Sequence, residues 1–374
     1  MNRESLIRLN QIPGVGSATI HRLLSAFKTE QQMLDAGPQG LREILGARAQ
    51  QELIEAILRS ASDSSADQEL ERARSAGIRI ITLEDPDYPE LLRTIPDPPP
   101  VLYVKGTLIQ EDAAAVAIVG TRAATLYGLA TARRLATELG RAGITVISGL
   151  AEGIDGVAHD GALQGRGRTI AVLGHGLNHL FPARHRGLAS RIIESGCLVS
   201  EFPMEMPPSP ANFPRRNRVI AGLSLGTVVV EAPLRSGALI TAHEALEQGR
   251  EVFAVPGPVS SVNSRGTHQL LREGARLVEQ AWDVLEELAP HLKARVVRWD
   301  GTDSKPEAVD SPEMDLSEEE RAIHGAIPSA GTAAVDDLVQ ATEFSPARLL
   351  SLLTSLELKG RVRQVPGQGY SRLS

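Results

Sequence analysis

A series of five short, mostly apolar segments constrains the fold of this chain more than any other feature. The segments cover residues 115–119, 144–147, 169–173, 227–230 and 251–255, and stretches of helical character separate them. Short, β-branched apolar strands that alternate with helices indicate a parallel sheet covered by helices on both faces. The sequence therefore predicts an α/β fold built around this sheet.

Glycines and polar residues follow these strands directly. The residues in question are Gly120, Thr121 and Arg122 after the first strand, Gly149 after the second, Gly174 after the third and Glu231 after the fourth. In parallel α/β sheets, ligands bind in the crevice beyond the carboxyl ends of the strands. Tight turns alone explain some of the glycines, but they do not explain why the charged residues Arg122 and Glu231 stand beside them. We therefore expect a ligand site at this edge of the sheet.

An arginine-rich run lies between the third and the fourth of these strands. It contains Phe213, Arg215, Arg216, Asn217 and Arg218, in a chain whose formal net charge is -7. Guanidinium groups suit phosphate oxygens, and a phenylalanine ring offers a base a surface for stacking. The alternative is a helix start whose arginines pair with carboxylates or lie in solvent. The position of the run favours a nucleic-acid site. The negative net charge of the chain, however, argues against indiscriminate binding to duplex DNA.

Several common chemistries are missing from the sequence. No Gly-Lys-Ser or Gly-Lys-Thr follows a glycine loop, so a Walker-type ATP site is absent, and no strand end matches a dinucleotide fingerprint. His175 and His179, or Asp155 and His159, have the spacing of a pair of metal ligands. Such pairs more often bond the backbone and hold a loop, so we predict no metal and no cofactor.

The compartment follows from the cysteine content and the hydropathy. Cys197 is the single cysteine, so an internal disulfide is impossible, which suits a reducing cytoplasm. The first residues lead into no signal peptide, and no apolar stretch is long enough to cross a bilayer. We expect a cytoplasmic protein with no membrane partner.

The chain divides into four predicted segments. They are a helical domain at 1–68, the sheet domain at 69–290, an acidic linker at 291–315 and a winged-helix domain at 316–374. Within the first, residues 12–17 have the pattern of a helix-hairpin-helix turn before a serine N-cap, which can hold a phosphate on free amides. Packing against a neighbouring domain is an equally good interpretation of that turn. For the winged helix, protein contact or weak DNA binding is at least as well supported as recognition of a DNA groove.

The motifs together resemble one family, the DNA processing protein A family (DprA, also called Smf), bacterial single-strand DNA-binding mediators of recombination. The matching blocks are 118–122, 148–159, 171–174, 200–203, 213–224, 231–241 and 249–257, in order and at close spacing. The resemblance implies an extended Rossmann-like core between a helix-hairpin-helix or SAM-like domain and a winged helix. It also implies a homodimer that binds single-stranded DNA without hydrolysing it and helps to load the RecA recombinase, as in natural transformation.

Residue roles follow from the resemblance and the strand-end chemistry together. We expect the phosphates of the DNA to be held by Gly120, Thr121, Arg122, Ser236 and Gly237. The glycine turns at Gly149 and Gly174 would let the DNA strand approach the protein backbone. Arg215, Arg216 and Arg218 would line the mouth of the crevice, Phe213 would stack on a base, and Asn217 would bond a base edge or pin the loop.

Four further residues complete the predicted site. Asp155 and His159 would shape the adjacent turn, and Glu231 would fix an arginine. His268 departs from the family pattern, because it stands where an asparagine is common. Thr121 replaces a frequent serine and keeps the hydroxyl.

Two rival functions remain open. Phosphoribohydrolases have similar cores, and Glu231, Glu244 and Glu247 offer acid–base groups, although residues 231–237 lack the doubled glycine expected of such enzymes. Ser236 and Gly237 belong to no assignable Ser-His-Asp arrangement and indicate an anion-holding turn at a helix start. A transcriptional regulator is the other rival, with the winged helix reading duplex DNA and the core sensing a nucleotide.

Overall fold

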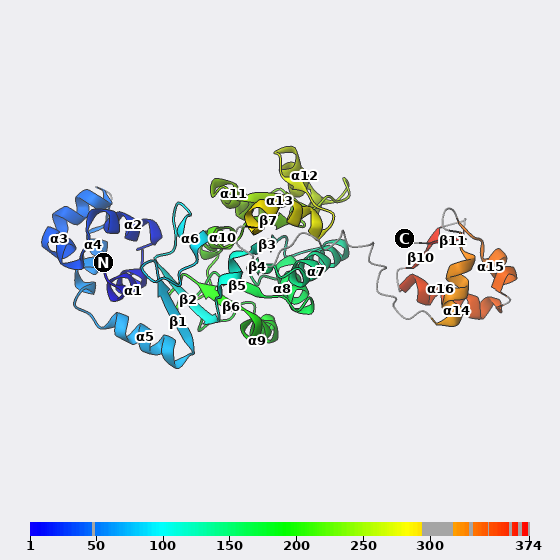
Figure 1. Cartoon of the computed structure of the whole chain (residues 1–374), viewed down its shortest axis with the longest axis horizontal. Coiled ribbons are helices and arrows are strands. Elements are labelled where there is room, and N and C mark those ends of the chain that lie inside the picture. The colour runs from blue at the N-terminus through cyan, green and yellow to red at the C-terminus, as the bar shows by residue number, and fades with distance from the viewer. Residues whose placement is uncertain are drawn as a thin grey trace. The chain divides into compact units, whose positions relative to one another are not determined.

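The computed structural model describes residues 1–46, 49–293, 317–328, 332–342, 344–358, 361–365 and 369–372. The chain divides into two compact units, Met1–Trp299 and Asp300–Ser374 (Figure 1). None of the helices within these described ranges is both long enough and apolar enough to traverse a bilayer.

A nine-stranded sheet forms the centre of the first unit, in the order β1-β2-β6-β5-β4-β3-β7-β8-β9. The strands are β1 (Ile78–Thr82), β2 (Val101–Gly106), β3 (Ala115–Val119), β4 (Thr145–Ser148), β5 (Thr169–Leu173), β6 (Cys197–Ser200), β7 (Gly226–Val229), β8 (Glu251–Ala254) and β9 (Arg276–Leu277). Those from β3 to β9 pair in parallel, whereas β1 and β2 add an antiparallel edge beside β6. The predicted parallel sheet is confirmed.

Helices cover both faces of this sheet, as its apolar strands require. They are α6 (Glu90–Arg93), α7 (Leu126–Arg141), α8 (Ile154–Gln164), α9 (Arg186–Ser195), α10 (Asn212–Gly222), α11 (Gly237–Glu247), α12 (Arg265–Arg272) and α13 (Ala281–Lys293). Alternate residues of β3 enter different cores: Ala117 packs with α10 and α11, and Ile118 packs with α7, α8 and α13. The Rossmann-like α/β architecture is therefore confirmed.

The order of the strands creates a switch point between β3 and β7. From β3 the chain adds β4, β5 and β6 on one side, and it then adds β7, β8 and β9 on the other. The two sets of connections leave β3 and β7 in opposite directions, and a crevice opens at their carboxyl ends. Residues 120–122 and Glu231 follow these two strands, so the fold places the predicted site at the switch point.

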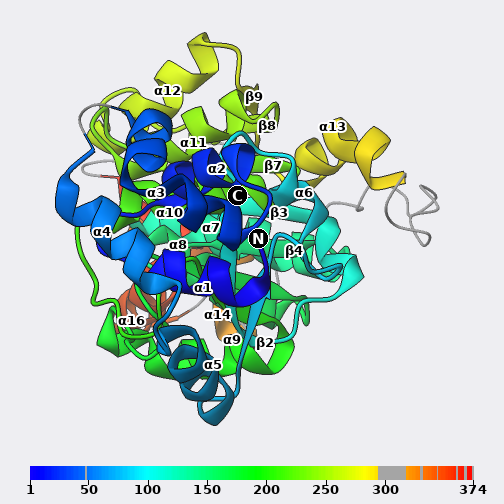
Figure 2. The same cartoon turned by 90° about the vertical axis from the view of Figure 1, so that its left-hand side faces the viewer.

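The N-terminal segment is helical, as predicted. It consists of α1 (Arg3–Gln11), α2 (Ser17–Ala26), α3 (Glu30–Leu45), α4 (Gln51–Ser60) and α5 (Ser65–Ser75), and the first four form the blue bundle in Figure 1 and Figure 2. These helices share a hydrophobic core with β1, β2 and α9. The predicted boundary at residue 68 falls inside α5, and the domain limits stay a prediction.

The turn between α1 and α2 differs from the prediction in the residue that caps α2. Gly14 adopts a φ of 86°, a conformation that favours glycine, as a helix-hairpin-helix turn requires. The N-cap of α2 is Gly16, whereas Ser17 was predicted to be the cap. Ser17 is the first helical residue, and its hydroxyl instead donates hydrogen bonds to the Asp97 carboxylate (2.6 Å) and to the Pro98 carbonyl (3.0 Å).

The second unit has the predicted winged-helix pattern. Its elements are α14 (Glu318–Ala326), α15 (Val335–Thr342), α16 (Pro346–Leu358), β10 (Val362–Val365) and β11 (Gly369–Arg372). Leu349, Leu353 and Leu356 of α16 pack with Ile323 and Tyr370 in a core of their own. Most of the predicted acidic linker lies outside the described residues, and 291–293 belong to α13.

Candidate nucleic-acid interface

A cleft of about 330 Å³ opens at the switch point, and we call it the rim cleft. Eight predicted DNA-binding residues line it: Gly120, Thr121, Arg122, Phe213, Arg216, Asn217, Ser236 and Gly237. Its lining also includes Asp155, Thr241 and Arg235. The fold therefore gathers residues from the loops after β3, β4 and β7 and from the first turns of α8, α10 and α11 into one concave surface.

The loop after β3 is held rigidly at the base of the cleft. A Cβ atom on Gly120 would lie 2.5 Å from the Ile154 side chain, so only glycine fits there. The amide of Thr121 donates to the Glu231 carbonyl at 2.7 Å. The Glu231 carboxylate accepts from the amide (2.9 Å) and the hydroxyl (2.5 Å) of Thr125, at the start of α7. The prediction that Glu231 fixes an arginine is wrong: its carboxylate bonds Thr125, and the ion pairs among the described residues include none with Glu231.

Arg122 projects from this rigid loop. Its side chain is exposed, and its guanidinium lies 5.2 Å from the centre of the Phe213 ring. The ion pairs described for the structure include none with Arg122. A cation that is held against an aromatic face and has no carboxylate partner keeps its charge available to a phosphate.

Arg216 forms the charged floor of the cleft. Its side chain is only 5% exposed, and its guanidinium donates to the Gly149 carbonyl at 2.7 Å and to the Val172 carbonyl. A Cβ atom on Gly149 would lie 2.2 Å from that guanidinium, so Gly149 makes room for Arg216 and does not line the cleft. Burial lowers the pKa of Arg216 to about 10, which leaves it protonated at neutral pH.

Asp155 is the carboxylate that faces Arg216 in the cleft. It accepts hydrogen bonds from the amides of Gly149 (3.1 Å) and Ala151 (3.4 Å), so its predicted role in shaping the turn is confirmed. Burial raises the pKa of Asp155, although the nearby Arg216 opposes the shift. The floor therefore balances one buried cation against one buried acid, and Arg122 adds a further positive charge.

Two histidines near the cleft bond other groups of the protein. His159 Nδ1 lies 2.7 Å from the Thr169 hydroxyl, and burial, with the nearby His185 and Arg216, lowers the pKa of His159 to about 3. His175 Nδ1 lies 3.0 Å from the Gly176 carbonyl. Within the described ranges, no three His, Cys, Asp or Glu side chains cluster as metal ligands would.

Phe213 presents an aromatic surface at one wall of the cleft. Its ring centre lies 6.2 Å from that of Phe181, in a tilted arrangement. A Cβ atom on Gly174 would lie 2.9 Å from the Phe213 ring, so Gly174 allows this ring to pack and does not itself line the cleft. The half-buried ring is pre-positioned for stacking, which lowers the entropy lost on binding.

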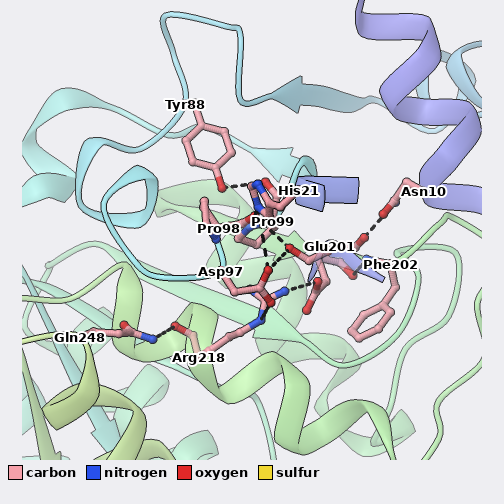
Figure 3. Close-up of polar contacts among 12 residues, drawn as sticks. Asn10, His21, Tyr88, Asp97, Pro98, Pro99, Glu201, Phe202, Arg218 and Gln248 are labelled. Atoms are coloured by element: carbon pink, nitrogen blue, oxygen red, sulfur yellow. Dashed lines mark hydrogen bonds and ion pairs between the residues drawn. The ribbon is translucent and has the colours of Figure 1, made fainter. Parts of the chain in front are cut away.

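The three arginines of α10 separate onto different sides of the helix. Arg216 enters the rim cleft, whereas Arg215 lies over the Phe202 ring at 5.2 Å and does not line the cleft. Arg218 forms ion pairs with Glu201 (2.6 Å) and Asp97 (3.3 Å), as Figure 3 shows. Residues three apart share a helix face, but neighbouring residues lie about 100° apart. The prediction that all three arginines line the mouth of the crevice is therefore wrong, because only Arg216 is among the residues that line the rim cleft.

The remaining predicted residue, His268, also lies outside the cleft lining. Its Nε2 is 3.0 Å from the Gly257 carbonyl, so it bonds the loop after β8. In contrast, the sequence prediction missed Arg235, which is exposed and lines the cleft. Its position directly before Ser236 and Gly237 was the signal that could have identified it.

The fold and the cleft define a Rossmann-like α/β protein with a cationic site at the switch point and an attached winged-helix unit. A family model described as DNA recombination-mediator protein A matches residues 79–289, and one described as DprA winged helix domain matches 306–368. The chain therefore belongs to the DNA recombination-mediator protein A family, and the resemblance seen in the sequence is confirmed.

Individual relatives agree with this assignment. Protein Smf of Synechocystis is 35% identical over 389 residues, which cover 97% of each chain. Protein Smf of Escherichia coli is 42% identical over 301 residues, 79% of this chain and 77% of that protein.

Two solved structures of DNA processing protein A share the fold. The Streptococcus pneumoniae protein has a TM-score of 0.67 and 33% identity, over 77% of this chain and 98% of that one. The Helicobacter pylori protein has a TM-score of 0.51 and 29% identity, over 57% of this chain and 97% of that one. The latter structure is described as showing a unique single-stranded DNA binding mode.

Proposed function

We propose that this protein binds single-stranded DNA in the rim cleft. The observation that carries the proposal is the charge of the lining: Arg122, Arg216 and Arg235 face Asp155 as the one acidic residue, in a chain of net charge -7. Such a local excess of guanidinium groups attracts phosphates although the chain as a whole carries a negative net charge.

Each part of a nucleotide has a suitable partner in the cleft. Arg122 reaches phosphates from the rim, and the N-terminus of α11 at Ser236 and Gly237 adds backbone amides that favour an anion. Phe213 stacks on a base. Asn217 donates to the Gly237 carbonyl at 3.1 Å, so of its two predicted roles the contacts support pinning the loop.

The shape of the cleft supports a preference for single strands. Phe213 lies inside the cleft lining, and a base reaches it only when it is unpaired from its partner strand. In this proposal Arg218 and His268 support the fold and make no contact with DNA.

Membership of the family supports the wider role. As a recombination mediator, the protein would deliver the bound strand to the RecA recombinase in the cytoplasm, during natural transformation or other homologous recombination. It would act as a homodimer through the Rossmann-like domain, without enzymatic activity, cofactor or metal. Light scattering would test the dimer, and RecA-dependent strand exchange would test the delivery.

Replacement of Arg122 by alanine tests the proposed cleft. We expect the affinity for an oligothymidylate strand to fall by about tenfold or more, because a charge-assisted phosphate contact is lost. The slope of log affinity against log salt should become shallower by about 0.7. Arg276→Ala is the matched control. Arg276 is an exposed arginine that pairs with Glu287 (3.1 Å) and does not line the rim cleft.

Three outcomes would contradict the proposal. A folded Arg122→Ala protein that binds as tightly as the Arg276→Ala control would show that the strand lies elsewhere. Release of free base from nucleoside monophosphates would favour the phosphoribohydrolase alternative, and a preference for duplex oligonucleotides would favour a transcriptional regulator.

A further inference from the structure

A second groove adjoins the rim cleft, and we call it the side groove. It has a volume of about 420 Å³ and lies among α7, α8 and the start of α9. Arg122 and Ala123 line both the side groove and the rim cleft. A polynucleotide that leaves the rim cleft past Arg122 therefore reaches the side groove without crossing another surface.

The walls of the side groove are cationic. Arg133, Arg184 and Arg191 line it together with Arg122. Arg133 and Arg191 (2.7 Å) share the single carboxylate of Asp160, and Arg184 pairs with Glu152 at 2.5 Å. Four guanidinium groups thus face two carboxylates, and the groove keeps an excess of positive charge.

The ion pairs in this groove are of a kind that a ligand can displace. The side chains of Arg133 and Arg191 are 42% and 51% exposed and that of Asp160 is 24% exposed, and ion pairs that solvent reaches in this way contribute little to stability. Hydrogen bonds from Arg191 and Arg133 outweigh the effect of burial and lower the pKa of Asp160, so this carboxylate stays charged at neutral pH. A phosphate of the strand would replace the Asp160 carboxylate as the partner of Arg133 and Arg191, which already converge on this one group.

The floor of the side groove is apolar. It is formed by Ala124, Leu129, Val157 and Leu188, and the ring among its lining residues is the imidazole of His185, whose Nδ1 lies 2.9 Å from the Leu150 carbonyl. A sugar packs against such a floor, whereas a base finds no Phe, Tyr or Trp ring among the lining residues on which to stack. The groove therefore suits the backbone of a strand better than its bases.

We propose that the side groove is a second subsite for the same single strand that the rim cleft binds. Arg122 holds the phosphate at the junction, and Arg133 and Arg191 hold the phosphates beyond it. This inference rests on the proposed function of the rim cleft. It predicts that the side groove contributes to the binding of long strands only, because a short strand is confined to the rim cleft.

Adjacent arginines on α7 provide a matched test with the full-length protein. Arg133 lines the side groove, whereas Arg134 lies outside both clefts and pairs with Glu138 at 3.4 Å. Their side chains are 42% and 49% exposed, so alanine removes a similar surface ion pair in each case. The probes are oligothymidylates of about 4 and about 16 nucleotides.

We expect Arg133→Ala to weaken binding of the longer strand by about fivefold and to reduce its salt slope by about 0.7. Binding of the shorter strand should not change, and Arg134→Ala should change neither. Asp160→Asn should act in the opposite direction and strengthen binding of the longer strand, which a damaged fold would not do.

Equal effects of Arg133→Ala and Arg134→Ala, or equal effects of Arg133→Ala on both strand lengths, would overturn the side-groove proposal. The Arg122→Ala protein separates this failure from failure of the rim cleft. If Arg122→Ala loses the short strand while Arg133→Ala behaves as its control, only the side groove is disproved. If Arg122→Ala retains the short strand, the proposed function itself fails.

Discussion

The two sides of α10 carry the same type of residue in different surroundings. On one side, Arg216 donates to backbone carbonyls at the ends of β4 and β5. On the other side, Arg218 is held by the carboxylates of Glu201 and Asp97. Arg216 bonds carbonyls and has the nearby Asp155 as its counter-charge, whereas Arg218 is paired directly with two carboxylates within the protein. The comparison separates an arginine available to a ligand from one that stabilises the fold.

The contacts around Arg218 also join the N-terminal helices to the sheet. We call Arg218, Asp97, Glu201 and the groups bonded to them the Arg218 network (Figure 3). Asn10 of α1 donates to the Glu201 carbonyl at 3.1 Å, and Ser17 of α2 donates to Asp97. The packing interpretation of the helix-hairpin-helix turn therefore has direct support.

The largest expected effect is on stability, at Arg218. Arg218→Met leaves Glu201 buried without its partner, so we expect the free energy of unfolding to fall by about 3–5 kcal/mol. Urea denaturation followed by tryptophan fluorescence measures this, because Trp282 lies in α13 of the first unit. The folded protein should keep its affinity for single strands.

A double variant serves as the control for that experiment. Arg218→Met combined with Glu201→Gln should recover much of the loss, since no buried charge is left alone. A stable Arg218→Met protein with lost DNA affinity would show that Arg218 belongs to the DNA site after all.

The second expected effect is a difference in pH response between His159, which is near Arg216, and Glu201, which is paired with Arg218. Burial, with the nearby His185 and Arg216, lowers the folded pKa of His159 in α8 to about 3 from 6.5, so its contribution to stability is present above pH 6.5 and lost as the pH falls. The wild type should lose about 2 kcal/mol between pH 6.5 and about pH 5 through this group.

Glu201 in the Arg218 network has the opposite sign. Burial raises the pKa of Glu201 despite the nearby Arg218, so its contribution is greatest at low pH and is lost as the pH rises through the folded value. Denaturation of His159→Gln and Glu201→Gln proteins across this pH range measures both. An unchanged acid response in His159→Gln would contradict the assignment.

Much of the fold could be predicted because its signals are local. The strand predicted at 115–119 is β3 without a shift, and that at 144–147 differs from β4 (Thr145–Ser148) by one residue at each end. Their apolar composition and terminal glycines determine both the strands and the edge at which the site lies.

The direction of each side chain was harder to predict, because it depends on partners far away in sequence. Nothing near Arg218 indicates that it meets Asp97 and Glu201, and nothing near Glu231 points to Thr125. The arginine run thus predicted a charged helix correctly, but helix geometry alone does not decide which arginine enters the cleft.

The central claim is that an unpaired strand lies in the rim cleft with a base on Phe213. Photo-crosslinking with an oligonucleotide that carries 5-bromodeoxyuridine, followed by mass spectrometry of the peptides, tests it most directly. We expect crosslinks to the peptide that contains Phe213, and we expect them to be lost in Phe213→Leu and kept in Arg218→Met. Crosslinks confined to the winged-helix unit, or to the turn before Ser17, would contradict it.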